Sequence, residues 1–211
     1  MKIKHGIPFS LKNENKPIDD MTISLDLKTK DDTFVFSLGQ NTDISKESYD
    51  HPTFVYVISG HGFFNETEVK ENDFIFYDEG CYLSKKTTEG LVYVEFHIKK
   101  ENSIMNEKIK AGEIFKLKDL LPYMEDKIVN IEVFKTDKSR LSVISMAKGT
   151  QLTPHKAPGE ALLFILDGKA TLNYEGKEYI LTEGDNFSFA KDGIHAITAD
   201  TDFKFALFLE I

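Results

Sequence analysis

Phe54-Val-Tyr-Val-Ile-Ser-Gly60 and Leu162-Leu-Phe-Ile-Leu-Asp-Gly168 are two versions of one segment, an apolar run that ends at a glycine. A second matched pair follows them, Asn72-Asp-Phe-Ile-Phe-Tyr-Asp-Glu-Gly80 in the first half and Asp185-Asn-Phe-Ser-Phe-Ala-Lys-Asp-Gly193 in the second. A repeat of this length indicates two modules of the same architecture, so each half can be interpreted against the other.

The repeat divides the chain into two modules of about 100 residues each, which we expect over residues 1–106 and residues 107–211. The boundary falls in the charged stretch 99–110, which lacks strand alternation and is typical of a linker. After it, residues 117–123 favour one short helical turn, which Pro122 limits.

Both modules consist of short runs of alternating or β-branched residues, which predict strands. Turn residues separate these runs, and Glu175-Gly176 has the chemistry of a two-residue hairpin turn. Many short strands at close spacing are typical of an antiparallel sandwich or barrel, so the predicted fold class is all-β. The expected strands are Met21–Leu27, Phe34–Leu38, Thr53–Ser59, Phe74–Tyr77, Leu91–Ile98, Ile128–Phe134, Leu141–Met146, Ala161–Asp167, Ala170–Tyr174, Phe187–Ala190 and Phe203–Ile211.

Composition excludes several classes of protein. The formal net charge of -9 opposes general binding of nucleic acid, which depends on a basic surface. The single cysteine, Cys81, allows no intramolecular disulfide, and no base or positive charge beside it activates the thiol, so a buried unreactive thiol is expected. No segment has the composition of a signal peptide or the length of a membrane span, so a cytoplasmic protein without membrane contact is expected.

Two spaced motifs in the second module resemble those of the cupin superfamily. Gly149-Thr-Gln-Leu-Thr-Pro-His155 supplies the opening glycine and first histidine of one motif, and Gly168 closes it at the expected distance. Gly184 and His195 match the ends of the other motif. The resemblance implies two tandem jelly-roll barrels, each a double-stranded β-helix, and hence a bicupin.

The chain departs from the residue set of a metal-binding cupin, which has three histidines and one glutamate. Ala157 replaces the second histidine and Ala161 the glutamate, so the resemblance implies His155 and His195 as the remaining metal ligands. Neutral imidazole suits Zn, Fe, Ni or Cu, and mixed nitrogen and oxygen sites accept Mn. Glu160 is a third candidate ligand if a bulge at the preceding Pro-Gly turns it inward, because adjacent strand residues face opposite sides. No organic cofactor is implied.

The second motif, between Gly184 and His195, also departs from the family pattern at two positions. Ala190 stands where the family has a proline, and Asp192 stands where it has a glycine. The structural alternative treats His155 as a loop residue and His195 as a hydrogen-bonded strand residue, neither in the core. Because neither histidine has the sequence context of a core residue, replacing either is expected to cost little folding stability.

The first module lacks imidazole at the positions that match the motif. Glu47, Tyr49, Thr53 and Tyr82 stand there, with Tyr82 matched to His195, so this barrel is expected to be degenerate and without a transition metal. His97 lies late on the last expected strand of the module, where a half-buried, hydrogen-bonded ring is the structural interpretation.

Three functions from different classes follow. The first is a metal-dependent enzyme acting on a small molecule, since the resemblance implies dioxygenases, isomerases and decarboxylases among its members. The second is a metal-free module that binds or senses a small molecule. The third is a structural role in which the chain forms a homodimer, or a pseudo-dimer of its own two barrels.

Overall fold

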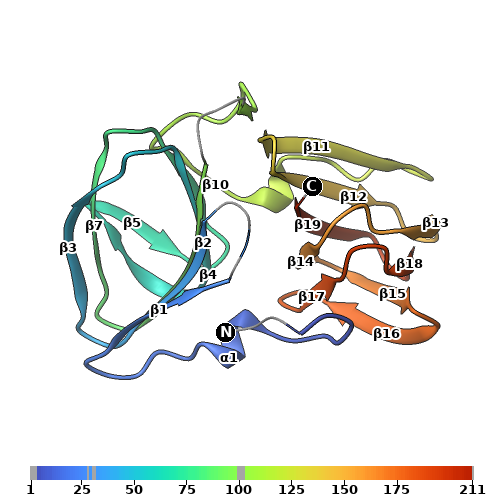
Figure 1. The fold of residues 1–211 in the computed structure, drawn as a ribbon, viewed down its shortest axis with the longest axis horizontal. Coiled ribbons are helices and arrows are strands. Elements are labelled where there is room, and N and C mark those ends of the chain that lie inside the picture. The colour runs from blue at the N-terminus through green and yellow to red at the C-terminus, as the bar shows by residue number, and fades with distance from the viewer. Residues whose placement is uncertain (1–3, 28, 30–31, 99–102, 211) are drawn as a thin grey trace. The chain divides into compact units, whose positions relative to one another are not determined.

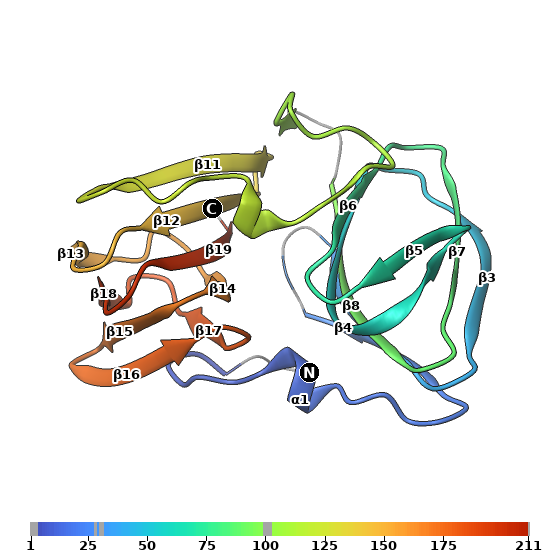
Figure 2. The same cartoon turned by 180° about the vertical axis from the view of Figure 1, so that it is seen from behind.

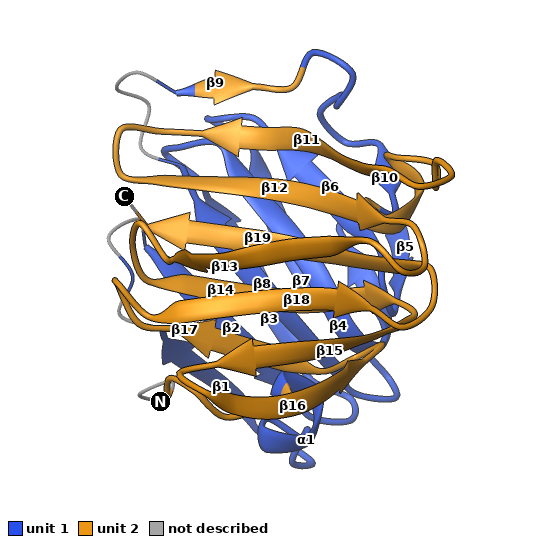
Figure 3. Ribbon diagram, turned by 90° about the vertical axis from the view of Figure 1, so that its right-hand side faces the viewer, with its two compact units in different colours: residues 1–2, 11–103, 107–116 blue, residues 3–10, 104–106, 117–211 orange. Residues whose placement is uncertain are grey.

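The computed structural model describes residues 4–27, 29, 32–98 and 103–210, which form two compact units. Unit 2 contains residues 4–10, 104–106 and 117–210, and unit 1 contains the other described residues (Figure 3). Of the predicted linker, residues 99–102 lie outside the described residues. In the part of the chain that the structure describes, no helix has the length and apolar composition needed to cross a bilayer.

Unit 1 is an antiparallel β-structure whose blue and green strands curve round a common interior (Figure 1). One layer has the strand order β1-β2-β8-β4-β6-β10, and β3, β7, β5 and the end of β4 form the other. Its elements are α1 (Leu11–Glu14), β1 (Thr22–Asp26), β2 (Thr33–Leu38), β3 (Asp43–Ser48), β4 (Thr53–Phe64), β5 (Thr67–Lys70), β6 (Phe74–Tyr77), β7 (Tyr82–Lys86), β8 (Leu91–His97) and β10 (Ile114–Phe115).

Unit 2 consists of two antiparallel sheets, with the orders β17-β14-β19-β12-β11-β9 and β13-β18-β15-β16. Figure 2 shows β11, β12, β19 and β14 following one another in the first of these sheets. Its elements are β9 (Ile104–Met105), the 3₁₀ turn η1 (Leu117–Asp119), β11 (Ile128–Lys135), β12 (Ser139–Met146), β13 (Gln151–Lys156), β14 (Ala161–Asp167), β15 (Lys169–Tyr174), β16 (Lys177–Thr182), β17 (Asn186–Phe189), β18 (Ile194–Ala199) and β19 (Phe203–Glu210).

The two units repeat one strand order. The series β1-β2-β8-β4-β6 of unit 1 corresponds to β11-β12-β19-β14-β17 of unit 2, and β3-β7 corresponds to β13-β18. The all-β jelly-roll prediction is therefore confirmed. The short helical turn before Pro122 is confirmed as η1, and the hairpin turn between β15 and β16 has left-handed backbone at Glu175 (φ 50°) and Gly176 (φ 76°), as a two-residue turn requires.

The strands that the sequence did not predict are chiefly β3, β7, β13 and β18. Strands β3 and β13 are exposed along most of their length and carry polar side chains, so they lack the apolar alternation by which strands are recognised. They are held by pairing with β7 and β18 instead. These overlooked strands carry His155 and His195 in unit 2 and Glu47 and Lys85 in unit 1.

The glycine that ends the repeated apolar run is needed for close approach of the backbone. Gly60 has φ 90° and Gly168 has φ 80°, a left-handed conformation that side chains rarely adopt. A Cβ atom at Gly60 would overlap the carbonyl oxygen of Gly90, and one at Gly168 would overlap that of Asp202. The same steric constraint therefore fixes the same turn in both barrels.

Gly168→Ala is expected to lower the free energy of unfolding by about 3 kcal/mol, because it combines backbone strain with overlap against a fixed carbonyl. Gly176→Ala is the matched control, since Gly176 is also left-handed but has open space around it. Urea unfolding of both variants measures the difference. Equal losses in the two variants would contradict the role of the close approach.

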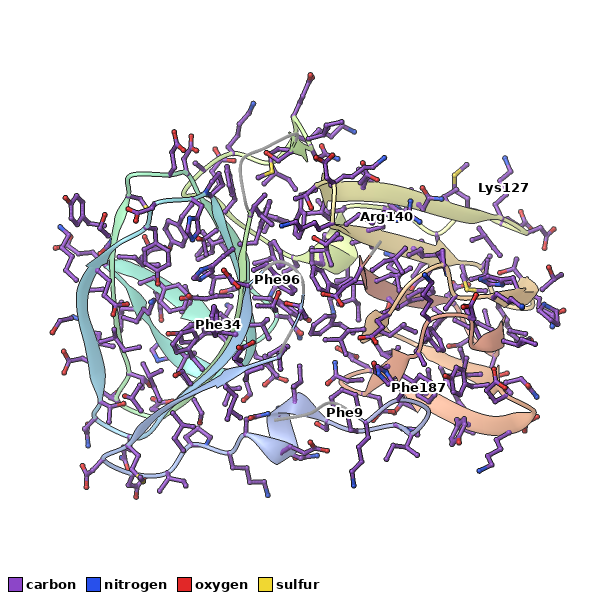
Figure 4. The ribbon with its side chains drawn as sticks, viewed as in Figure 1. Phe9, Phe34, Phe96, Lys127, Arg140 and Phe187 are labelled. Atoms are coloured by element: carbon purple, nitrogen blue, oxygen red, sulfur yellow. The ribbon has the colours of Figure 1, made fainter. Side chains whose placement is uncertain are left out.

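Each unit receives a segment that precedes the other unit in sequence. Residues 4–10 come before the strands of unit 1 but pair with β17, where Phe9 and Asn186 exchange backbone hydrogen bonds of 3.0 and 2.8 Å. Figure 4 labels Phe9 on this segment and Phe187 on β17. Residues 107–116 come before most of unit 2 but pair with β6 through β10.

The two exchanged segments are themselves a repeat, Gly6-Ile-Pro-Phe-Ser-Leu-Lys12 and Gly112-Glu-Ile-Phe-Lys-Leu-Lys118. Gly6 donates to the Ser188 carbonyl at 2.9 Å, and Gly112 donates to the matching Phe76 carbonyl at 2.8 Å. The division expected at residue 106 therefore describes the bulk of each unit but not these segments, whose exchange a single sequence boundary cannot express.

Removal of residues 2–9 is expected to destabilise the edge of unit 2, although the segment stands at the start of the chain. The Asn186 amide loses its acceptor, so its hydrogen exchange accelerates about tenfold or more. The Gly112 amide, whose bond to Phe76 remains, serves as the internal control. Faster exchange confined to β6 and β10 would contradict the assignment of the segment.

Candidate functional site: an imidazole pair and a buried charge cluster

The structure brings His155 and His195 together in unit 2. Strands β13 and β18 pair in antiparallel register with His155 directly opposite His195. Their ring centroids lie 4.2 Å apart with an angle of 55° between the ring planes. Two side chains forty positions apart in sequence thus meet on one face of the sheet.

A β-bulge positions the first of these histidines. The register of β13 against β18 shifts between Leu152 and His155, so Thr153 and Pro154 are left out of the regular ladder. Pro154 has no backbone N–H to contribute to a ladder, which suits this position. A bulge bends the strand and redirects the side chain that follows it, here His155.

Main-chain carbonyls hold both imidazoles by the same nitrogen. His155 Nδ1 lies 2.7 Å from the Thr153 oxygen, and His195 Nδ1 lies 3.1 Å from the Gly193 oxygen. A carbonyl only accepts, so each Nδ1 carries a proton, and in the neutral ring the lone pair is then on Nε2. Within the described residues neither Nε2 makes a hydrogen bond. Both rings therefore present the nitrogen that a metal ion or an acidic hydrogen takes.

His195 is the more buried of the two rings. Its residue exposure is 7%, and it stacks on Phe189 with ring centroids 4.1 Å apart and planes at 19°. Burial lowers the pKa of His195, and the nearby His155 lowers it further, against the opposing effect of the Gly193 carbonyl. The expectation that neither histidine belongs to the core is wrong for His195, whereas His155 is exposed.

The structure does not bring Glu160 to this pair. Glu160 is exposed and precedes β14, and its backbone oxygen accepts from the Glu210 amide at 2.8 Å. The bulge that redirects a side chain lies before His155, not at Pro158-Gly159 as the inward position of Glu160 requires. Among the described residues no group of three His, Cys, Asp or Glu side chains is placed to hold a metal ion.

The structure explains why aspartate is tolerated at the glycine position of the second motif. Asp192 has φ 65°, in the left-handed region that glycine adopts without steric cost. Aspartate tolerates this conformation better than most residues, because its short polar side chain bonds locally. The turn that leads into His195 is therefore kept despite the substitution.

In unit 1 the register corrects one predicted equivalence. Glu47 lies opposite Leu83, as His155 lies opposite His195, so Leu83 and not Tyr82 takes the place of His195. Tyr82 is 59% exposed and lies opposite Ser48. Side chains alternate along a strand, so an alignment error of one residue moved Tyr82 to the wrong face.

Unit 1 contains a buried charge that the motif comparison did not reveal. Lys85 on β7 and Glu95 on β8 are each 1% exposed, and Lys85 Nζ lies 3.0 Å from Glu95 Oε1. The matching positions of unit 2 hold Ile197 and Leu207, judged by strand register. Burying a charge is costly unless it is paired, so this pair replaces apolar packing at a specific place in the barrel.

Tyr49 and His97 complete the bonding of this pair. Tyr49 Oη donates to Glu95 Oε1 at 3.0 Å and accepts a short hydrogen bond from Lys85. His97 Nε2 lies 2.9 Å from Glu95 Oε2, which confirms the hydrogen-bonded ring expected there. Lys85, Glu95, Tyr49, His97 and the neighbouring Tyr93 are called the Lys85 cluster below.

The cluster sets the charge state of its carboxyl group. Burial alone raises the pKa of Glu95, but the hydrogen bond of His97 and the charge of Lys85 outweigh burial and hold this pKa below its ordinary value. Cys81 is half-buried and not fully buried as expected, and its partial burial raises the pKa of the thiol. One sequence signal was present: Glu95 is the only charge in the apolar strand 91–97.

Glu95→Gln is expected to lower the free energy of unfolding at pH 7 by about 3–5 kcal/mol, because it leaves the buried ammonium of Lys85 without an opposite charge. The native pKa of Glu95 lies below its ordinary 4.5, so its contribution is present above about pH 4.5 and is lost as the pH falls through the native value. Urea unfolding should therefore show the wild type and the variant converging under acidic conditions.

Glu66→Gln in the exposed turn after β4 is the control for this experiment. A difference between Glu95→Gln and the wild type that stays constant from neutral pH to well below the ordinary pKa would contradict the assignment.

The chain is similar to known proteins in sequence over part of its length and in fold over most of it. Residues 142–211 match the family model of the cupin domain. A cupin 2 conserved barrel domain protein from Leptotrichia buccalis aligns over 100% of this chain and 99% of its own, with 24% identity and a TM-score of 0.82. A salicylate 1,2-dioxygenase from Pseudaminobacter salicylatoxidans aligns over 90% of this chain and 76% of its own, with 12% identity and a TM-score of 0.61. Among curated proteins none matches the chain.

Proposed function

We propose that this chain is a member of the cupin superfamily, whose domain model matches residues 142–211, and that unit 2 binds a divalent transition metal together with a chelating small molecule. His155 and His195 are the protein ligands, each through Nε2. The observation that carries the proposal is the shared tether of both Nδ1 atoms to main-chain carbonyls. Metal-ligating histidines commonly donate their other N–H in this way, which fixes the tautomer and the ring orientation.

The two imidazole nitrogens are too few to complete the coordination shell of a metal ion. Two imidazoles fill only part of the coordination shell of Zn, Mn, Fe, Ni or Cu, which takes four or more ligands. Glu160 does not join them, so water or ligand oxygens must supply the rest. Metal affinity is therefore expected to depend strongly on a chelating small molecule, and the two should bind together.

The chain orients the two imidazole rings and removes His195 from solvent. The bulge before His155 and the stacking of Phe189 on His195 fix the two rings with respect to each other. Burial keeps His195 in the neutral form that a metal requires. When bound, the metal would polarise an oxygen atom of the ligand, which is the chemistry that dioxygenase, isomerase or decarboxylase activity requires.

The choice of ligand class draws on the structural relatives. The salicylate 1,2-dioxygenase shares the fold, and a variant of that enzyme is described in complex with gentisate. At 12% identity this likeness shows the fold alone and does not identify a substrate. A hydroxybenzoate is used here only as a probe, because its carboxylate and hydroxyl oxygens can chelate a metal. A metal-free ligand module and a homodimer remain the competing proposals, and the same experiment separates them from metal binding.

Calorimetric titration of the untagged full chain with Zn²⁺ tests the proposal, with and without salicylate. The wild type should bind one equivalent, and salicylate should raise the affinity about tenfold or more. His155→Ala and His195→Ala should each weaken binding about tenfold or more, since each removes one of two protein ligands. His61→Ala, which removes a part-exposed histidine of unit 1, should leave binding unchanged.

Thermal unfolding gives a second readout, because a metal that binds only the folded state raises the melting temperature. Binding that is unchanged in both His155→Ala and His195→Ala, or no binding with and without salicylate, would refute the metal site. A melting temperature raised by salicylate alone would then favour the metal-free module.

A further inference from the structure

The ammonium group of Lys85 has one weakly satisfied donor. Glu95 and Tyr49, both buried, take two of its three N–H groups. The remaining partner is Glu47, whose Oε2 lies 3.6 Å away and whose side chain is 57% exposed. That distance exceeds an ordinary charge-assisted hydrogen bond. One donor of a fully buried cation is thus directed toward an exposed carboxylate that can leave for solvent.

Tyr93 places a second unsatisfied donor in the same interior. Its side chain is fully buried, and its hydroxyl has no hydrogen-bond partner among the described residues. The ring stacks on Phe36 at 5.1 Å with planes at 10°, and it meets Phe64 edge-on at 5.2 Å. These two contacts therefore hold the ring, and with it the position of the hydroxyl oxygen, in place.

The two donors belong to one group of side chains. Lys85 Nζ lies 5.9 Å from the centroid of the Tyr93 ring. The pKa of Tyr93 is raised mainly by burial, and also by the charges of Glu95 and Glu47 and by Tyr49, which places the hydroxyl in the electrostatic reach of the cluster. Buried polar groups nearly always form hydrogen bonds. We therefore expect an acceptor for the Tyr93 hydroxyl and for the third N–H of the Lys85 ammonium.

We propose that the interior of unit 1 is a second ligand site, in which Lys85 and Tyr93 bind the carboxylate of a small molecule and Glu47 is the group that this carboxylate displaces. The site is separate from the imidazole pair and does not depend on the function proposed for unit 2. Exchange of one carboxylate for another leaves the net charge around Lys85 unchanged, so the ligand enters without an unpaired charge.

Strand register supports a binding position at Glu47. Glu47 stands where His155 stands in unit 2, after the same kind of bulge, here between Ile44 and Glu47. Both barrels thus have an exposed polar side chain at one equivalent point. Lys85 acts there as a hydrogen-bond donor and ion-pair partner, as it already does toward Tyr49 and Glu95.

Nuclear magnetic resonance titration of the full chain with acetate and benzoate tests the proposal, after removal of metal with a chelator so that unit 2 does not contribute. Backbone amides of β3, β7 and β8 should shift on addition of either carboxylate. Acetamide and benzamide, which have the same shape without the charge, should bind at least about tenfold more weakly, since hydrogen bonds to charged groups are the stronger ones. Inorganic phosphate tests whether the site accepts oxyanions in general, and binding as tight as that of acetate would overturn the assignment to carboxylates.

Three variants have distinct expected effects. Glu47→Gln removes the competing carboxylate and should tighten benzoate binding about threefold to tenfold, whereas Tyr93→Phe removes a donor and should weaken it by a similar factor. Lys85→Met should abolish binding. The matched controls are Glu66→Gln, Tyr56→Phe and Lys86→Met, of which Lys86 is the exposed neighbour of Lys85 on β7, and each should bind as the wild type does.

Tyr93→Phe keeps the test valid if Lys85→Met fails to fold. It removes a hydroxyl that has no described partner, so the ligand-free protein should not lose stability. No shift with either carboxylate in the wild type and in Glu47→Gln would overturn the proposal and leave a buried water as the partner of Tyr93. Weaker binding by Glu47→Gln, or unchanged binding by Tyr93→Phe, would overturn it as well.

Discussion

A small closed barrel must fill its interior with side chains, and a charge placed there requires an opposite charge within reach. Unit 2 meets this constraint with apolar residues such as Ile197 and Leu207, and unit 1 meets it with Lys85 and Glu95 at the matching positions. The ion pair then fixes its neighbours, because both oxygens of Glu95 are engaged. The buried charge pair of unit 1 therefore lies at the positions where unit 2 has apolar packing.

The backbone that surrounds these interiors is the same in both units. Each has a bulge in the strand that precedes the repeated apolar run, and each has a candidate site residue directly after it, Glu47 in one unit and His155 in the other. Each run ends at a glycine that packs against a carbonyl oxygen. A common frame thus presents a carboxylate to a buried cation in unit 1 and an imidazole to a second imidazole in unit 2.

Much of the fold was predictable because its central strands are apolar on both faces. The bounds of β6 and β14 agree with the runs expected from the sequence, and the convergence of His155 and His195 was anticipated from motif spacing. The strands β3 and β13 were not predicted, since they are exposed and polar and gain their order from pairing. Pairing partners are distant in sequence, so periodicity within a strand does not reveal them.

The errors at the candidate sites have related causes. Tyr82 was matched to His195 because a shift of one residue changes little in the sequence but reverses the face of the strand. The prediction of a degenerate first barrel without a transition metal considered only the motif positions, so it did not reveal Lys85 and Glu95, which lie at other positions in apolar surroundings. The exchange of residues 4–10 and 107–116 between units is a long-range property, which the repeat of these segments signals only in retrospect.

The proposed metal site depends most directly on the protonation of two rings, because only unprotonated Nε2 atoms at both His155 and His195 make the pair a ligand for a metal. Long-range proton–nitrogen correlation spectra of the metal-free protein, recorded slightly above neutral pH, report this for each imidazole. The account predicts that both rings carry their proton on Nδ1, bonded to the carbonyls of Thr153 and Gly193. A proton on Nε2 of either ring would contradict it.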